Sequence, residues 1–259
     1  MPTFVARRPS VVRSTNTPDA RALFTPIPDA RALDSVVHYG RDPSVRPMPR
    51  ATMSRRKRAL DIALAGALLV ITSPVWLAIA VAIKMTTRGP VLFRQQRMGL
   101  NEVPFTLLKF RSMLFGAPET AHELFVTSMI SATPATSAVN GIHKLQQDAR
   151  ITRVGRWIRR TSLDELPQLI NVLRGDMSLV GPRPPLAYEV VRYETWQHER
   201  LTVRPGITGL WQVSGRNHLS YAEMCRVDVR YVRDWSFAMD LRIILRTPWA
   251  MFVERGGAS

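Results

Sequence analysis

Two adjacent carboxylates, Asp164 and Glu165, follow closely after Arg156, Arg159 and Arg160 in the sequence. The chain has 36 Lys and Arg residues against 20 Asp and Glu, and its formal net charge is +16. Basic surroundings favour the ionised form of a carboxylate and attract phosphate groups. An anionic nucleophile and an anionic substrate can therefore meet here, so the pair is the foremost candidate for a reactive centre.

The local sequence also allows a structural role for this pair. Ser162-x-x-Glu165 matches a capping box, and acidic residues favour the start of a helix. The apolar residues that follow have the i, i+3, i+4, i+7 spacing of a helix that ends at Gly175: Leu166, Leu169, Ile170 and Leu173. This pattern predicts that Asp164 and Glu165 occupy the first turn of that helix.

Composition excludes several kinds of site. The single cysteine, Cys225, rules out an intramolecular disulfide and a Cys-x-x-Cys motif. The five histidines lack the spacing of a zinc site. A basic chain can bind nucleic acid, but no helix-turn-helix, zinc finger or stripe of aromatic and basic residues supports that here. An anionic membrane or a phosphorylated substrate remains, and no nucleic-acid partner is expected.

Two segments have the composition of irregular chain. Residues 1–50 contain eight of the 19 prolines and several arginines, and they predict a disordered tail because few large apolar residues lie there. Residues 117–147 are rich in Ala, Ser and Thr, which predicts an insertion or a mobile loop.

The 22 residues 62–83 carry no charge and predict a membrane segment. As a straight helix they would be roughly 33 Å long, about the thickness of the hydrocarbon core of a bilayer. Ser73-Pro74 lies near the midpoint, where proline removes a backbone hydrogen bond. Basic residues flank both ends, which favours a cytoplasmic position for each. A re-entrant helical hairpin satisfies both features, and a single kinked span is the alternative.

Shorter patterns predict the elements around the candidate centre. Residues 91–110 mix short apolar groups with a turn at 99–102 and predict a β-hairpin. Residues 153–160 and the segment around 241–249 combine apolar helical spacing with arginines, which is typical of amphipathic helices in a headgroup layer. The expected fold is therefore α+β and mainly helical, with a small β-hairpin or sheet.

Six motifs occur in order and resemble those of the bacterial sugar transferases, the monotopic polyprenyl-phosphate phosphoglycosyl transferases that initiate surface polysaccharide synthesis. The resemblance covers residue 54 to about 255. The motifs are Lys57-Arg58-x-x-Asp61, the Ser73-Pro74 break, Lys109-Phe110-Arg111-Ser112-Met113, Ser162-Leu163-Asp164-Glu165-Leu166, the run from Asn171 to Pro184, and Val203-Arg204-Pro205-Gly206-Ile207-Thr208-Gly209.

The resemblance implies transfer of a sugar 1-phosphate from a UDP-sugar to polyprenyl (undecaprenyl) phosphate, with release of UMP. It implies a monotopic protein on the cytoplasmic face of the bacterial inner membrane, in contact with an anionic membrane surface. The expected organisation is the tail at 1–50, a basic flank and re-entrant helix at 54–88, and a cytosolic catalytic domain at 89–255. A homo-oligomer is left open.

By the same resemblance, Asp164 is the nucleophile that forms an aspartyl phospho-sugar, and Glu165 binds Mg²⁺. Lys109, Arg159 and Arg183 are expected to hold phosphates, and Asp240 to support the metal or the basic cluster. Weaker candidates for the nucleotide and sugar are Gly206, Thr208, Gln212 and Arg216.

Two matters stay open at the level of sequence. The segment Trp211-Gln212-Val213-Ser214-Gly215-Arg216 resembles members that use simple hexoses, which favours glucose or galactose over N-acetylated sugars. The competing class is a membrane-tethered binding or regulatory protein in which Asp164 and Glu165 only cap a helix. Release of UMP from a UDP-sugar distinguishes the two.

Overall fold

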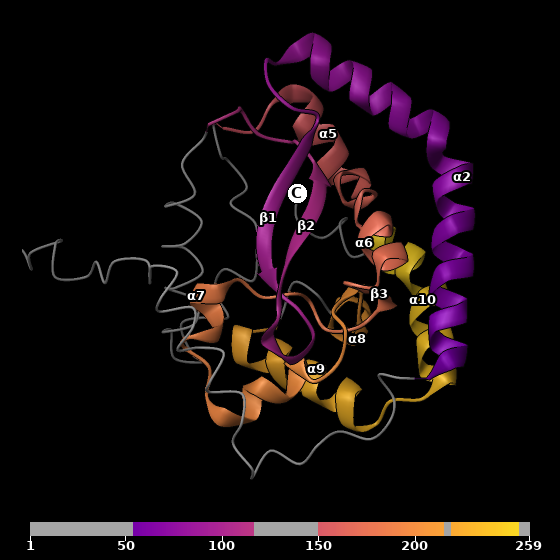
Figure 1. The fold of residues 1–259 in the computed structure, drawn as a ribbon, viewed down its shortest axis with the longest axis vertical. Coiled ribbons are helices and arrows are strands. Elements are labelled where there is room, and N and C mark those ends of the chain that lie inside the picture. Colours follow the sequence, from indigo (N-terminus) through magenta and orange to yellow (C-terminus); the bar gives the residue numbers. More distant parts are fainter. Residues whose placement is uncertain (1–53, 117–149, 215–218, 254–259) are drawn as a thin grey trace, which may run out of the picture.

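A computed structural model describes residues 54–116, 150–214 and 219–253 (Figure 1). The predictions for the tail at 1–50, for residues 117–147 and for Arg216 lie outside the described residues. Within them, a long helix curves around a body of shorter helices, and a β-hairpin crosses the middle of that body.

The long helix is α2 (Arg55–Thr86), which contains the whole predicted membrane segment. It is one continuous helix with a bend, not two separate helices joined by a turn (Figure 1). Pro74 cannot donate a backbone hydrogen bond to Val70, and the Ser73 hydroxyl donates to that carbonyl oxygen instead, at 2.8 Å. The predicted break therefore appears as a bend, at which the Val70 carbonyl oxygen still accepts a hydrogen bond.

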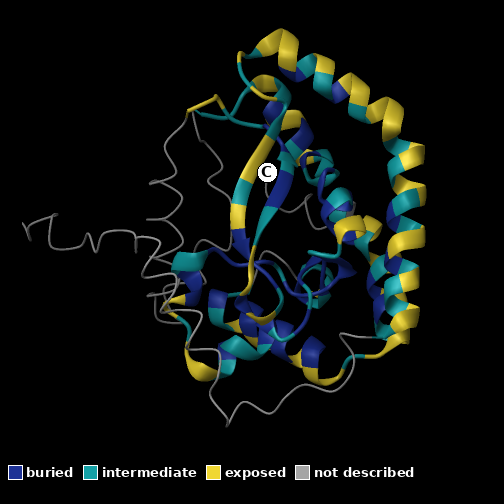
Figure 2. Ribbon diagram, in the orientation of Figure 1, coloured by how far each residue is buried: buried dark blue, intermediate teal, exposed yellow. Residues whose placement is uncertain are grey.

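Most of α2 is exposed. Only 11% of its most apolar 18-residue stretch is buried, and it is the one helix in the described part of the chain that is long and apolar enough to cross a membrane. Figure 2 shows the exposed residues along its outer side. The two ends are anchored: Ala65 joins the main core near one end, and Ile79 and Ile83 pack with Phe110 and Ile158 near the other.

The predicted hairpin is confirmed. Strands β1 (Leu92–Met98) and β2 (Pro104–Phe110) pair antiparallel, with Leu92 opposite Phe110. The connecting turn, η3 (Leu100–Glu102), holds Asn101 and Glu102 at positive φ. The backbone N–H of Gly99 closes the turn by donating to the carbonyl oxygen of Val103 at 2.9 Å.

The candidate centre lies between two helices. Helix α5 (Arg153–Arg160) begins at Thr152, whose hydroxyl accepts from the Gly155 backbone, and α6 (Gln168–Arg174) ends at Gly175 with φ 94°. Both helices were predicted, but α6 begins later than the apolar stripe suggests. Asp164 and Glu165 lie in a separate 3-10 turn, η5 (Leu163–Glu165), and not in the first turn of α6. Pro167, at the N-cap of α6, has no N–H to continue a single helix across that point.

A second, parallel pair of strands was not predicted. Strand β3 (Ser178–Val180) pairs with β4 (Gly206–Thr208), so that two of the sequence motifs lie side by side. The strands approach so closely that a Cβ atom on Gly206 would lie 2.1 Å from the Gly181 nitrogen. Glycine is therefore required at this crossing for steric reasons.

The remaining described elements complete the body. They are α7 (Ala187–Val190), η6 (Thr195–Leu201), α8 (Leu210–Val213), α9 (Tyr221–Arg233) and α10 (Phe237–Val253). The main core joins α2, β2, α6, β3, α9 and α10 through residues such as Leu107, Val172 and Ile243. The predicted class, mainly helical α+β with a small sheet, agrees with this architecture.

Candidate active site

The acidic pair is fixed by its apolar neighbours. Leu163 and Leu166, on either side of the pair, pack against the cluster that contains Ile158 and Phe110. Ser162 adopts φ 55°, a left-handed conformation that is strained for a residue with a side chain, and its side chain makes no capping hydrogen bond. The capping box suggested by the sequence is therefore not formed.

The two carboxylates differ in environment. Asp164 is buried, with 6% of its surface exposed. Glu165 is more open, and its Oε1 accepts a hydrogen bond from the Lys109 ammonium at 3.1 Å. Lys109 comes from β2, so two of the predicted motifs, 56 positions apart, meet at this contact. Asp164 is thus an enclosed carboxylate, whereas Glu165 is partly exposed and forms an ion pair with Lys109.

Asn171 holds the helix behind the acidic pair against the hairpin. Its Oδ1 accepts from the Leu108 backbone at 3.0 Å, and its Nδ2 donates to the Thr106 carbonyl at 2.8 Å and to Asp176 at 3.1 Å. The residue is fully buried. Sequence reasoning assigned it no role, although a polar residue between the buried Leu169 and Val172 was a usable signal.

Arg159 lies in the last turn of α5, and this helix contacts η5 directly. Its side chain is neither buried nor fully exposed. A cation at a helix C-terminus is favoured by the helix dipole and needs no acidic partner there. The structure therefore places Arg159 on the element that leads into Asp164 and Glu165.

Arg183 lies in the loop after β3 and contacts a buried carboxylate. Its Nη1 is 3.4 Å and 3.3 Å from the two carboxylate oxygens of Glu189, and its side chain is 29% exposed. Burial lowers the pKa of Arg183 but the neighbouring Glu189 raises it, and the net shift is upward. Arg183 is therefore a permanent cation with one part at the surface.

The weaker candidates mostly make structural contacts. The Gly206 backbone donates to the Pro182 carbonyl at 2.8 Å, and Thr208 shares a hydrogen bond of 2.8 Å with Thr247 on α10. The Gln212 side chain donates to the Ile207 carbonyl at 3.3 Å. These contacts place the three residues around β4.

Asp240 lies in a different cluster from Glu165. Its Oδ2 accepts from the Lys57 ammonium at 2.6 Å and from the Trp235 indole at 3.1 Å, and its Oδ1 accepts from the Tyr231 hydroxyl at 2.7 Å. Asp240 is 1% exposed. The structure thus joins Asp240 to Lys57 in the basic motif at the start of α2, a contact that was not predicted.

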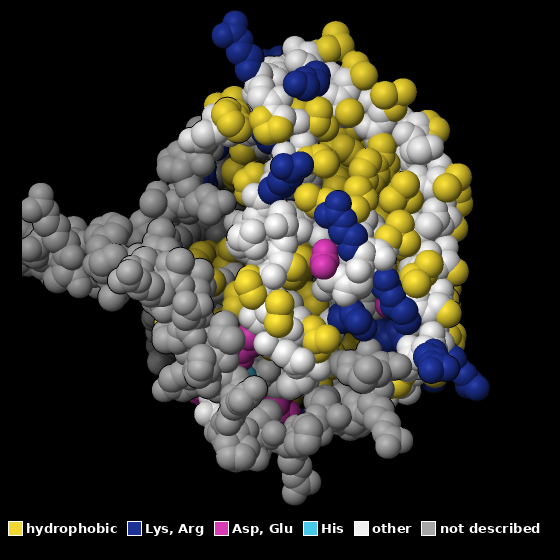
Figure 3. Space-filling view, viewed as in Figure 1, with side chains coloured by type: hydrophobic (Ala, Val, Ile, Leu, Met, Phe, Trp, Pro, Cys, Tyr) yellow, Lys and Arg dark blue, Asp and Glu magenta, His cyan; other side chains and the backbone are white. Residues whose placement is uncertain are grey.

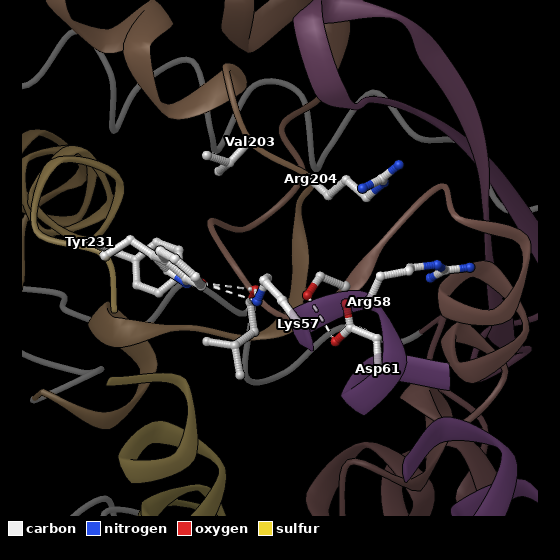
Figure 4. Close-up of a pocket in the computed structure, with 9 residues that line it drawn as sticks. Lys57, Arg58, Asp61, Val203, Arg204 and Tyr231 are labelled. Atoms are coloured by element: carbon white, nitrogen blue, oxygen red, sulfur yellow. Dashed lines mark hydrogen bonds between the residues drawn. The ribbon is translucent and has the colours of Figure 1, made fainter. Parts of the chain in front are cut away.

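The same region forms a small pocket. Figure 4 shows Lys57, Asp61 and Tyr231 converging on it, with Arg58 and Arg204 at its side. Asp61 accepts from the Ser178 hydroxyl and the Leu179 backbone, both at 3.0 Å. The cavity of about 20 Å³ has room for a water molecule but not for a nucleotide sugar. The cavity therefore belongs to the packing contact between α2 and the body and is not a substrate site.

The side chains around the acidic pair fit a magnesium ion that takes only one or two of its ligands from the protein. Within residues 54–116, 150–214 and 219–253, no three His, Cys, Asp or Glu side chains gather as a metal cage. Magnesium in phosphoryl-transfer sites is commonly bound by one or two carboxylates together with water and substrate phosphates. Glu165, a partly exposed carboxylate beside Asp164, fits that requirement.

Comparison with known proteins bears on these motifs. The chain is 41% identical over 200 residues to the exopolysaccharide production protein ExoY of Rhizobium meliloti (strain 1021), covering 77% of this chain and 87% of the relative. It is 42% identical over 211 residues to the UDP-glucose:undecaprenyl-phosphate glucose-1-phosphate transferase of Caulobacter vibrioides, covering 78% of this chain and 71% of the relative.

A further relative is longer than this chain. The undecaprenyl-phosphate galactose phosphotransferase of Salmonella typhimurium is 43% identical over 203 residues, which cover 78% of this chain and 41% of the relative. The family described as "Bacterial sugar transferase" matches residues 52–254, a range that contains the acidic pair and every described candidate residue. The chain therefore belongs to the bacterial sugar transferase family.

Proposed function

We propose that this protein transfers a hexose 1-phosphate from a UDP-sugar to polyprenyl phosphate, and so initiates the synthesis of an exopolysaccharide or another surface polysaccharide. The names of two relatives describe such chemistry, with undecaprenyl phosphate as the acceptor. The observation that carries the proposal is the buried Asp164 on a strained turn, directly beside the contact between Glu165 and Lys109.

The proposed reaction consists of two displacements at phosphorus. A carboxylate oxygen of Asp164 attacks the β-phosphorus of the UDP-sugar, the bond to the bridging oxygen breaks, and UMP leaves. The sugar phosphate is then held as an acyl phosphate on Asp164. A phosphate oxygen of the lipid attacks the same phosphorus, the bond between that phosphorus and the Asp164 oxygen breaks, and Asp164 returns to a carboxylate. A covalent intermediate lets a soluble donor and a lipid acceptor use one site in turn.

The basic residues make this attack electrostatically feasible. A carboxylate and a diphosphate repel each other unless positive charge lies between them. Lys109 is already beside Glu165, and Arg159 lies on the helix that leads into the pair. Arg183 supplies a further permanent cation from the loop after β3. Bound magnesium, held by Glu165, would add neutralisation of the leaving phosphate.

The arrangement of α2 supports re-entrant insertion over a full crossing. Near its start, Lys57 and Asp61 bind Asp240 and β3. In its second half, Trp76 packs edge-on against Phe110 with ring centroids 5.2 Å apart, and Ile83, near the end of the helix, lies in the same cluster. A helix whose two ends contact the same body cannot place them on opposite sides of a bilayer without losing one set of contacts.

The exposed surface supports the same insertion. The middle of α2 presents large apolar side chains to solvent, among them Val70 and Ile71, each 72% exposed. Leu245 and Trp249 on α10 are 78% and 70% exposed. Figure 3 shows this apolar surface along α2, with Lys and Arg side chains at its margins. Such a surface fits the apolar layer of a membrane, and its basic margin fits anionic headgroups.

We propose that the protein lies on the cytoplasmic face of the bacterial inner membrane, which the basic margin of the apolar surface and the cytoplasmic supply of UDP-sugars support. Glucose and galactose are the hexoses proposed for the donor. A screen of UDP-glucose, UDP-galactose and their N-acetylated counterparts, with undecaprenyl phosphate as the acceptor, measures this preference directly. Faster UMP release with an N-acetylated donor would contradict the hexose assignment.

Asp164→Asn tests the nucleophile. The purified wild type, incubated with a donor but no lipid, is expected to carry a hexose phosphate on the peptide that contains residues 163–166, detectable by mass spectrometry. The variant should form no such adduct and release no UMP. Asp234→Asn, a change of the same kind at an exposed position outside the site, should keep the adduct. Near-normal turnover by Asp164→Asn would show that another group attacks phosphorus.

The insertion of α2 has its own test. Single cysteines replace Arg56 or Lys84 in a Cys225→Ser background, and sealed inverted vesicles are treated with a membrane-impermeant maleimide. Re-entrant insertion predicts that both positions are labelled from the cytoplasmic side. Labelling of one position alone would indicate a spanning helix.

A further inference from the structure

A group of five charged residues lies behind the loop that carries Arg183. Glu189 and Asp228 are fully buried, Arg200 is 1% exposed and Arg97 is 7% exposed. Arg183 is the member that reaches the surface, with 29% of its side chain exposed. We refer to these five residues as the buried charge cluster.

Arg183 is held in this cluster by both its side chain and its backbone. The two carboxylate oxygens of Glu189 lie 3.4 Å and 3.3 Å from Nη1 of Arg183. Arg200 donates from Nη2 to the carbonyl oxygen of Arg183 at 3.2 Å, and its charge is paired with Asp228. The guanidinium of Arg183 therefore has one side turned to Glu189 and the rest available toward the surface.

Glu189 is itself held in place from two other elements. The Tyr221 hydroxyl, on α9, donates to Oε2 of Glu189 at 2.9 Å. Arg97, on β1, places its Nη1 4.0 Å from Oε1. Burial raises the pKa of Glu189, but Arg183 and Arg97 lower it further, so the net shift is downward and the carboxyl group stays ionised. A fixed anion in this position restricts the orientation of the guanidinium it contacts.

The charges of the cluster do not balance. Three arginines face two carboxylates, which leaves one positive charge in excess. Burial also raises the pKa of Asp228 to about 6, against the opposing effect of Arg200, so acidification increases the excess. Buried charge is costly unless it is compensated. An anion that contacts Arg183 from the surface would complete the balance.

We propose that Glu189 is a positioning residue for the transfer reaction: it holds the Arg183 guanidinium so that the remaining donors face a phosphate group of the substrate. This inference rests on the proposed function. The phosphate belongs either to the diphosphate of the UDP-sugar or to the polyprenyl phosphate, and the two sources share the same chemistry at Arg183. Glu189 acts through Arg183 and does not itself touch the substrate.

A double-mutant cycle separates positioning from a general role in stability. Glu189→Gln, Arg183→Gln and the double variant are compared with the wild type by UMP release, with the concentrations of donor and lipid varied separately. A lost contact between charged groups predicts that Glu189→Gln raises KM for one substrate by at least about tenfold, with a smaller change in kcat. In the Arg183→Gln background, the same change should have little further effect.

Two further variants protect the test against a folding defect. Tyr221→Phe removes one hydrogen bond to Glu189 while keeping the charges, and it should raise the same KM by a smaller factor. Glu199→Gln is the matched control, because Glu199 also binds an arginine, Arg233, but at an exposed position outside the cluster. It should leave both KM values unchanged.

The outcomes distinguish the inference from the proposed function. A rise in KM for the donor assigns Arg183 to the diphosphate, and a rise for the lipid assigns it to the polyprenyl phosphate. Calorimetric titration with inorganic pyrophosphate gives a readout that needs no turnover: about tenfold weaker binding by Glu189→Gln supports positioning even if the wild type releases no UMP. Unchanged KM and unchanged pyrophosphate binding, or equal effects of Glu189→Gln with and without Arg183, would overturn the proposal.

Discussion

Replacement of Asp240 by Asn separates a structural role for this residue from a role in metal binding. Asp240 is 1% exposed and accepts hydrogen bonds from Lys57, Tyr231 and Trp235. The amide has the same shape but carries no charge, so the Lys57 ammonium would remain in a largely buried position without its counter-ion. Removal of one partner from a buried ion pair costs about 3–5 kcal/mol.

That loss is a large part of a typical unfolding free energy of about 5–15 kcal/mol. For a domain of this size it corresponds to a decrease in Tm of roughly 6–20 °C. The measurement is thermal unfolding in lipid nanodiscs, followed by near-UV circular dichroism. Asp234→Asn is the control, since Asp234 forms an exposed pair with Arg230, and it should change the free energy of unfolding by less than about 1 kcal/mol.

Magnesium dependence completes this test. If Asp240 only supports α2, the magnesium concentration that gives half-maximal UMP release should match the wild-type value at a temperature where the variant is folded. A variant with wild-type Tm and a strongly increased magnesium requirement would refute the structural argument and identify Asp240 as a metal ligand.

Three other substitutions probe the site and its supports. Glu165→Gln should raise the magnesium concentration needed for half-maximal UMP release, and an unchanged requirement would argue against metal binding by Glu165. Because the pair of Glu165 with Lys109 is partly exposed, thermal unfolding should show a stability change of under about 1 kcal/mol. Asn171→Ala removes the hydrogen-bond partners of two backbone groups on β2 and should lower the free energy of unfolding in urea by about 2–4 kcal/mol. A urea midpoint equal to that of the wild type would disprove this expectation. Pro74→Ala restores a helical hydrogen bond at the bend, so helix content by far-UV circular dichroism should not fall. UMP release should decrease by roughly tenfold or more, because a straighter α2 strains the contacts at its ends. Full activity would show that the bend is dispensable.

The elements that the sequence predicted well are those with a strong local pattern. The helix over 62–83 followed from a long run without charge, and the hairpin at 91–110 and the helix that stops at Gly175 followed from apolar spacing and from turn or helix-end residues. The start of α6 was misjudged because an apolar stripe of helical spacing runs on through Pro167, where the chain divides into a 3-10 turn and a helix.

The contacts that hold the site together were beyond local patterns. Lys57 and Asp240 are 183 positions apart, and Asn171 bonds to a backbone group 63 positions away. Strands β3 and β4 pair over only three residues each, too short for an alternating pattern to be visible. Such contacts depend on the folded arrangement, whereas the identity of Asp164 and Glu165 as the candidate pair came from motifs alone.

The way in which α2 is built into the body has a practical consequence for producing the protein. Ala65 and Ile83 belong to the interior of the body, and Lys57 and Asp61 bind its buried polar groups. Deletion of residues 54–88 to obtain a soluble enzyme would therefore remove part of the hydrophobic core along with the exposed apolar surface of α2. Solubility would have to come from polar replacements limited to outward-facing positions such as Val70 and Ile71, which leave every internal contact in place.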